Sequence, residues 1–228
     1  MSRTRIHLFA LAATVAVSLP PALSAQEAQR NAENGGIHVA GWQGDADQGS
    51  TQDASFTMDG DAFHIVTGPA ITYWNPANTA SGDYTVQARF TEPAYMNLNN
   101  HPHPYGIVIG GHDLGTDQAR YLYCAAYGNG TFIVRGFGPE PFQLNGRRGE
   151  ANDAVHKAAG PGEPVTQEIA VSVKGDQVQC AINGTVVGSY AKDLVVGPGK
   201  LASTDGAYGV RFGHNTEAVV SGLGVQKP

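Results

Sequence analysis

The chain has little cysteine, little charge and no long apolar run beyond its first 25 residues. It contains two cysteines in 228 residues, and only 15% of its residues are charged. No CxxC pair exists and no histidine stands at ligand spacing beside either cysteine, which argues against metal or catalytic thiols. The best-marked catalytic motifs are also missing: there is no Gly-x-Ser-x-Gly elbow, P-loop or dinucleotide fingerprint.

The first 25 residues have the organisation of a secretory signal peptide. Arg3 and Arg5 form a positive n-region, Leu8–Leu19 is a short apolar run, and Ala22–Ala25 offers small residues for cleavage. The alternative is a membrane anchor, but the run falls short of the ~20 residues that a span needs. We therefore expect a signal peptide at residues 1–25, a flexible lead-in at 26–36, and one domain at 37–228. This domain would be secreted or periplasmic, and not transmembrane after processing.

The composition restricts the partners of that domain. Removal of residues 1–25 leaves 203 residues (228 less 25) and changes the formal net charge from −6 to −8, because Arg3 and Arg5 are lost. This acidic balance argues against nucleic acid, and against an anionic membrane bound through a basic patch. About 200 residues suit a single all-β core.

Short alternating runs separated by turn residues fill the domain. In Asp83–Thr91 apolar and polar side chains alternate, as in an antiparallel strand with one dry and one wet face. Asn183-Gly184, between Gln177–Ile182 and Thr185–Tyr190, is typical of a type I′ hairpin turn. No long segment has a 3.6-residue period. We expect an all-β fold, a two-sheet antiparallel jelly-roll sandwich of about a dozen strands.

Several strands can be placed along the chain. Residues 139–164 are expected to form a loop that crosses between the sheets. An acidic turn at Gly44–Gly49 is expected to separate a first pair of strands, Ile37–Trp42 and Ala54–Met58. Three runs are expected to form a meander within one sheet: Tyr105–Ile109, Arg120–Tyr127 and Thr131–Phe137.

Cys124 and Cys180 both fall in the middle of expected strands. An exported protein with two cysteines often pairs them in a disulfide. The alternative is two buried free thiols that act as small hydrophobic groups. Both remain open, because the sequence does not supply the Cα separation that a bridge requires.

Three features carry a family resemblance. They are the strand Asp83–Thr91 leading into Tyr105–Gly111, the hairpin around Asn183-Gly184, and Tyr208–Phe212 before a Val-rich last strand. Together they resemble the concanavalin A-like lectin/glucanase superfamily, which includes laminin-G-like modules. Within it the chain is most similar to the 3-keto-disaccharide hydrolase-like domains of exported bacterial proteins. The resemblance implies a jelly-roll fold over most of Ile37–Val225.

The chain departs from the catalytic patterns of those relatives. Pro104–Ile107 stands where the hydrolase-like domains carry an Asn-Ser-Gly-Ile-type stretch, and the Glu-x-Asp-x-x-Glu strand of the glucanases is missing. Ordinary glycoside hydrolysis needs two carboxylates at a fixed separation.

Aromatic residues on one strand offer a candidate binding surface. Tyr121 and Tyr123 fall on one face of a central strand, where a sugar's C–H face can stack on the rings. The alternative is that they are ordinary sheet residues favoured by β-propensity. Arg135, like Arg89 and Arg211, is expected on a polar sheet face. Further candidate ligand-binding residues are Trp74, at a strand end, and His112, in the loop before Arg120.

Two segments offer metal-ligating residue types at close spacing. Asp113 and Asp117 crowd the loop after His112 and offer oxygens to Ca²⁺, although a tight turn uses the same residues. Calcium is the one cofactor that the sequence suggests. His101 and His103 alternate with proline, and polyproline II would point them in different directions. Zinc needs three or four ligands, and only distant His112 or His214 remains, so zinc is not predicted.

The leading hypothesis is an exported, non-catalytic binding domain for carbohydrate or another cell-envelope polymer, using the face around Tyr121, Tyr123 and Arg135. A glycoside-acting, hydrolase-like enzyme is the first alternative. It would need two carboxylates about 5–10 Å apart in a cleft. The second alternative is a structural or protein-interaction domain. The lack of a recognisable carboxylate pair favours a non-catalytic protein.

Overall fold

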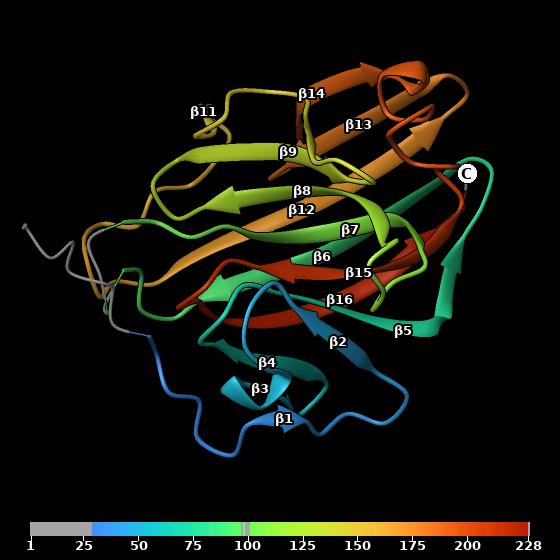
Figure 1. The fold of residues 1–228 in the computed structure, drawn as a ribbon. Coiled ribbons are helices and arrows are strands. Elements are labelled where there is room, and N and C mark those ends of the chain that lie inside the picture. Colours follow the sequence, from blue (N-terminus) through green and yellow to red (C-terminus); the bar gives the residue numbers. More distant parts are fainter. Residues whose placement is uncertain (1–28, 97, 99–100, 228) are drawn as a thin grey trace, which may run out of the picture.

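The computed structural model describes residues 29–96, 98 and 101–227, so the predicted signal peptide lies outside the described residues. Within that range the chain forms two large β-sheets packed on each other (Figure 1). Two short 3-10 helices, Thr51–Asp53 and Lys192–Leu194, are the only helices of the described part. The all-β, two-sheet prediction is therefore confirmed. None of the helices in these ranges has the length and apolar character to cross a membrane.

Sheet A contains both the first and the last strand of the described chain. Its strands lie in the order β1 (Gly36–Ile37), β3 (Ala54–Asp59), β4 (Ala62–Thr67), β16 (Glu217–Gln226), β6 (Tyr84–Glu92), β12 (Val165–Lys174), β13 (Gln177–Ile182) and β14 (Thr185–Ala191). All neighbours are antiparallel except β1 and β3, which are parallel.

Sheet B contains the predicted meander. Its strands lie in the order β10 (Phe142–Gln143), β9 (Thr131–Phe137), β8 (Arg120–Tyr127), β7 (Tyr105–His112), β15 (Gly206–Phe212), β5 (Ile71–Ala80) and β2 (Gln43–Ala46), and β11 (Glu150–Ala151) also pairs with β9. β7, β8 and β9 are antiparallel neighbours, as expected.

The start of the domain differs from the sequence prediction. β1 (Gly36–Ile37) overlaps the first expected strand at Ile37 alone, and the first three residues of the expected acidic turn belong to β2, an edge strand of sheet B. The alternation in β2 is hidden because its inward positions are Gly44 and Ala46. A Cβ on Gly44 would lie 2.8 Å from Cδ1 of Tyr73, so the glycine makes room for that ring.

The long connection at residues 139–164 crosses from sheet B to sheet A, as predicted, and it forms β10 and β11 on the way. Asn183 holds the second half of this connection against β12. The Asn183 side chain accepts from the Glu168 N–H (2.7 Å) and donates to Ala154 O and Gln167 Oε1 (both 2.8 Å). Asn183 and Gly184 have φ of 50° and 81°, which a type I′ hairpin turn requires.

The core lies between the sheets. Tyr84, Val86, Ala88 and Phe90 of β6 are all buried in it, which confirms the alternation read from the sequence. Cys124 of β8 and Cys180 of β13 form a disulfide across this core, with 6.0 Å between their Cα atoms. The bridge ties sheet B to sheet A and resolves the alternatives left open for the two cysteines.

Candidate functional site

A second group of apolar side chains lies on the outer face of sheet B, away from the sandwich core. On β8, Leu122, Cys124 and Ala126 face the core, so the residues between them face outward. The outward residues cluster with neighbours on β7 and β9; this outer cluster comprises Val108, Tyr121, Tyr123, Ala125 and Ile133. Tyr121 and Tyr123 therefore share one face of β8.

The two tyrosines are covered rather than open. Tyr121 and Tyr123 are 6% and 5% exposed. The ring of Phe137, on β9, lies 4.9 Å from the Tyr121 ring and 6.1 Å from the Tyr123 ring, measured between centroids. Phe137 and Tyr127 are half-buried. A ligand approaching this face would thus meet Phe137 before it met either tyrosine of the outer cluster.

Arg211, on β15, crosses the same face and is 8% exposed. Its Nη1 donates to Asp47 Oδ1 (3.0 Å), Thr72 Oγ1 (2.8 Å) and Tyr121 Oη (3.0 Å), and its Nη2 donates to Asp47 Oδ2 (2.5 Å). Burial lowers the pKa of Arg211, but Tyr121 and Asp47 outweigh burial and the pKa is raised. The guanidinium is therefore a fixed positive charge.

The Arg211 guanidinium also lies against the rings. Its Cζ is 4.9 Å from the Phe137 centroid, 5.5 Å from that of Tyr123 and 5.9 Å from that of Tyr121. Such distances allow cation–π attraction, which is stronger when the cation is desolvated. On β9, the Cζ of Arg135 lies 5.1 Å from the Phe137 centroid. Phe137 is thus bordered by two guanidinium groups.

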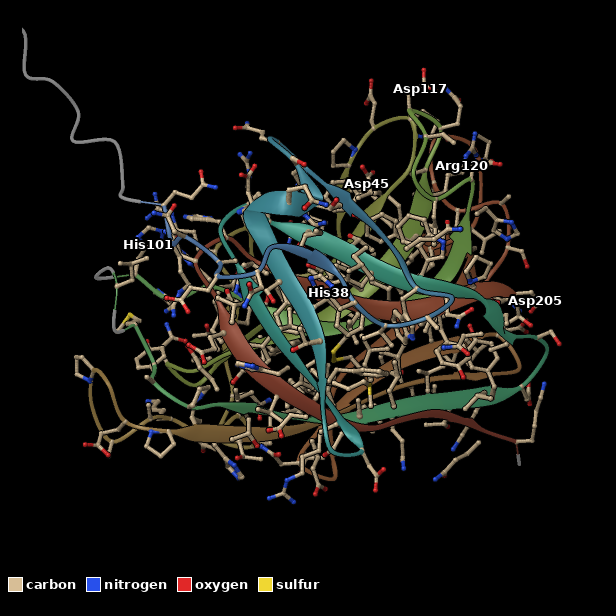
Figure 2. All side chains as sticks on the ribbon, turned by 90° about the horizontal axis from the view of Figure 1, so that it is seen from below. His38, Asp45, His101, Asp117, Arg120 and Asp205 are labelled. Atoms are coloured by element: carbon tan, nitrogen blue, oxygen red, sulfur yellow. A yellow bond between two sulfur atoms is a disulfide. The ribbon has the colours of Figure 1, made fainter. Side chains whose placement is uncertain are left out.

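Two aspartates border this face at β2. The Asp47 N–H donates to Ala70 O (2.9 Å), so Asp47 continues the pairing of β2 with β5. Asp45, labelled in Figure 2, lies two residues earlier in β2. The alternation of a strand places both residues on the same side, at a Cα separation of roughly 6.5 Å. Burial and the Asp47 charge raise the pKa of Asp45, while Arg211 opposes them. In the sequence both aspartates fall in the predicted acidic turn, and nothing there indicates the ion pair of Asp47 with Arg211.

The other predicted ligand-binding residues lie beside the loop that joins β7 to β8. Trp74 is 5% exposed, and a Cβ on Gly115 would lie 3.2 Å from Trp74 Cη2, so this loop lies against the indole. His112 Nε2 is 2.8 Å from Asp205 O, which ties the loop to the segment before β15. Asp113 begins a turn, since the Thr116 hydroxyl donates to its carbonyl (2.7 Å). Calcium at Asp113 and the exposed Asp117 stays a prediction.

Sheet A carries a groove of about 330 Å³ on its outer face. Small residues, Ala170, Ala181 and Gly222, line it together with polar side chains. Arg89 stands at this groove, with its Nη1 3.2 Å from Glu168 Oε1. Arg89 thus belongs to the opposite outer face from Arg135 and Arg211.

A second groove, of about 480 Å³, is lined by Asp47, Pro69 and His214, among others.

Comparison with known proteins bears on the fold. No family model matches the chain, and no curated protein matches its sequence. The carbohydrate-binding module CBM66 from Bacillus subtilis aligns with a TM-score of 0.55 at 8% identity, over 84% of this chain and 98% of that chain. A Bacillus subtilis protein of unknown function with a galectin-like fold aligns with a TM-score of 0.54 at 14% identity, over 81% and 88%.

The chain shares its jelly-roll fold with these two structures. This fold agrees with the predicted concanavalin A-like superfamily at the level of architecture. The finer resemblance to 3-keto-disaccharide hydrolase-like domains stays a prediction, because no family model matches. Identities this low show the fold alone, so the function has to be argued from the side chains.

Proposed function

We propose that the protein is an exported, non-catalytic carbohydrate-binding domain, and that the sugar lies on the outer face of sheet B against Phe137, Arg135 and Arg211. One observation carries the proposal: a buried arginine, held by Asp47, lies against the aromatic rings on the outside of the sandwich. Nothing in a two-sheet core demands this arrangement. The jelly-roll architecture shared with a carbohydrate-binding module supports it by analogy.

The chemistry of the face suits a sugar ring. A pyranose has an apolar C–H face, which packs on an aromatic ring, and hydroxyls at its edge, which accept from N–H donors. Phe137 supplies the half-buried ring, and the Arg135 and Arg211 guanidiniums border it at 5.1 and 4.9 Å. Arg211 is already fixed by Asp47, Thr72 and Tyr121, so little side-chain entropy is lost when a hydroxyl binds.

The test is a glycan array on the purified chain, followed by calorimetric titration of any sugar that binds. We expect Phe137→Ala and Arg135→Ala each to weaken binding by about tenfold or more, since each loss is on the order of 1.4 kcal/mol. Both residues are half-buried and on the surface layer, so the variants should fold. Tyr121 and Tyr123 are poorer probes, because their removal would open the outer cluster.

Arg89→Ala is the matched control, because it removes an arginine from the groove on sheet A. We expect it to leave the affinity unchanged. If Arg89→Ala abolished binding while Arg135→Ala did not, the sugar would lie on sheet A and the proposed surface would be wrong. An array without any bound glycan would contradict carbohydrate binding itself.

Asp45 and Asp47 favour a second candidate, a glycoside-acting enzyme. One carboxylate is paired with Arg211 and the other has a raised pKa, which is how acid and base roles separate in carboxylate pairs. Release of reducing ends from a bound glycan, lost in Asp45→Asn with binding retained, would establish the enzyme. Binding without turnover would establish the binding domain.

Export rests on two observations of different kinds. Residues 1–25 have a signal-peptide pattern, and Cys124 and Cys180 are joined in a disulfide, which persists in oxidising compartments. N-terminal sequencing of protein recovered from the periplasm or medium is expected to begin near Gln26. Recovery of an intact Met1 in the cytoplasm would contradict export.

A further inference from the structure

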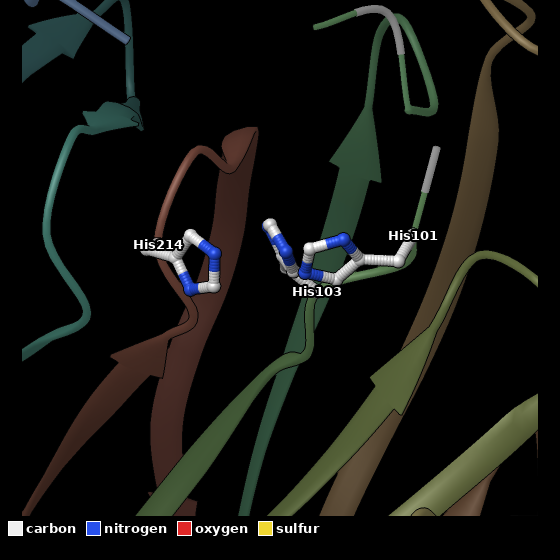
Figure 3. Close-up of side chains that lie close together, drawn as sticks. All are labelled: His101, His103 and His214. Atoms are coloured by element: carbon white, nitrogen blue, oxygen red, sulfur yellow. The ribbon is translucent and has the colours of Figure 1, made fainter. Parts of the chain in front are cut away.

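Three histidines from distant parts of the chain meet at one end of sheet B (Figure 3). His101 and His103 lie on the segment that enters β7, and His214 follows β15. Because β7 and β15 are antiparallel partners, the entry to one lies beside the exit from the other. None of these histidines belongs to the outer cluster that the proposed sugar site uses.

The sheet register brings two of them opposite each other. Tyr105 pairs with Phe212, and the Gly213 N–H donates to Pro104 O at 2.7 Å, so the pairing continues beyond both strands. The next residues in this register are His103 and His214. Gly213 permits the approach: a Cβ there would lie 2.8 Å from Pro104 Cδ and 2.9 Å from His103 Cβ. Any other residue would push the two segments apart.

His101 completes the group. The His101 and His103 rings have centroids 4.3 Å apart, so the expectation that they point in different directions is wrong. The His103 and His214 centroids are 3.8 Å apart, and those of His101 and His214 are 5.5 Å apart. In the described residues, these three form the one group whose metal-ligating atoms all lie within 4.8 Å of one another.

We propose that His101, His103 and His214 form a binding site for a transition-metal ion, with Zn²⁺ as the ion of best fit. Tetrahedral Zn²⁺ holds imidazole nitrogens at about 2.0–2.1 Å, which sets their mutual separation near 3.4 Å. Closing a triangle of 4.8 Å edges to that size moves each nitrogen by about 0.8 Å at most, within the reach of small ring rotations. The backbone therefore needs no rearrangement.

The ligand set selects the class of ion. Imidazole suits zinc, copper, iron and nickel, whereas calcium and magnesium require oxygen ligands. Three protein ligands leave a fourth position of a tetrahedral site open. His103 is buried, His214 is intermediate and His101 is exposed, so an ion can enter from the His101 side. The buried carboxyl group of Glu92 lines the same small pocket as His101 and His103.

The test uses the full chain without a histidine tag, freed of metal with EDTA and then titrated with Zn²⁺ against a chromophoric chelator. We expect one Zn²⁺ per chain. His101→Ala, at an exposed position, and His214→Ala are each expected to weaken the Zn²⁺ affinity by on the order of 100-fold. Removing a group that only supports a ligand costs up to about 100-fold, and a direct ligand should cost at least as much. Co²⁺ in place of Zn²⁺ should give the visible absorption of a tetrahedral site, and this absorption should disappear in both variants.

His112→Ala is the matched control, because it removes a histidine at the opposite end of β7. It is expected to keep the full Zn²⁺ affinity and the Co²⁺ spectrum. The proposal is overturned if the wild-type chain takes up no Zn²⁺, or if His101→Ala and His214→Ala bind it as tightly as the wild type. Equal losses in His112→Ala would also overturn it, since they would place the ion elsewhere. His103→Ala is a secondary probe only, because His103 is buried.

Discussion

Removing the Cys124–Cys180 bridge should lower stability by an amount that the chain-entropy model predicts. The two cysteines are 56 residues apart, and a closed loop of that length corresponds to about 4 kcal/mol of lost unfolded-state entropy. Both residues are buried, and the bridge is in the core between the sheets. We expect Cys124→Ala/Cys180→Ala to unfold at a denaturant concentration that corresponds to a loss of about this size, with Tm lower by roughly 8–16 °C.

The assay is equilibrium unfolding in urea, followed by fluorescence and circular dichroism on the same samples. The reduced wild-type chain is the control, because it keeps both sulfur atoms and loses only the crosslink. The double variant should be slightly less stable than the reduced chain, since its two buried sulfur atoms are gone. A loss below about 1 kcal/mol in both samples would refute the reasoning, because it would mean that the unfolded chain is already compact over this loop.

Three further variants test other parts of the structure. Arg211→Ala should cost about 2–3 kcal/mol in urea unfolding, because it removes hydrogen bonds made by a buried charged group. Arg211→Lys should recover only part of this loss, since an ammonium cannot form the bidentate pair with Asp47. Full recovery by lysine would contradict the geometry. Asn183→Ala should lower the free energy of unfolding by about 2 kcal/mol, through lost hydrogen bonds and strain at positive φ. Asn183→Gly should cost less, because glycine tolerates that φ. Equal losses in the two variants would show that backbone strain is unimportant there. Gly213→Ala should lower the Zn²⁺ affinity, because an added Cβ pushes His103 and His214 apart. Unchanged affinity would show that the close approach at Gly213 does not position the histidines.

The alternation of short strands predicted much of the fold. Asp83–Thr91 and the Asn183-Gly184 hairpin lie where the pattern placed them, because a sheet with one buried face imposes a period of two. The pattern failed at β2, where the inward residues are Gly44 and Ala46 and carry little hydrophobic signal. There the inward space is filled by Tyr73 from the neighbouring strand, which no local pattern reveals.

The candidate site was predictable only in part. The period of two placed Tyr121 and Tyr123 on one face, but it did not reveal that Phe137 covers them. Arg211 carried a signal, an arginine within the apolar run Tyr208–Phe212, but its partner Asp47 is 164 residues away in sequence. The histidine group was not predicted, because polyproline II geometry would separate His101 from His103, and because the approach of His214 depends on the pairing of β7 with β15.

The outer cluster also affects how readily β8 opens to solvent. β8 is covered by the core on one side and by the outer cluster on the other, whereas the exposed side chains of β14 leave that edge strand accessible. Amide hydrogens in β8 should exchange with solvent only when the whole domain unfolds, while those of β14 should exchange through local opening. β8 would then be the element whose backbone reports the global stability of the protein.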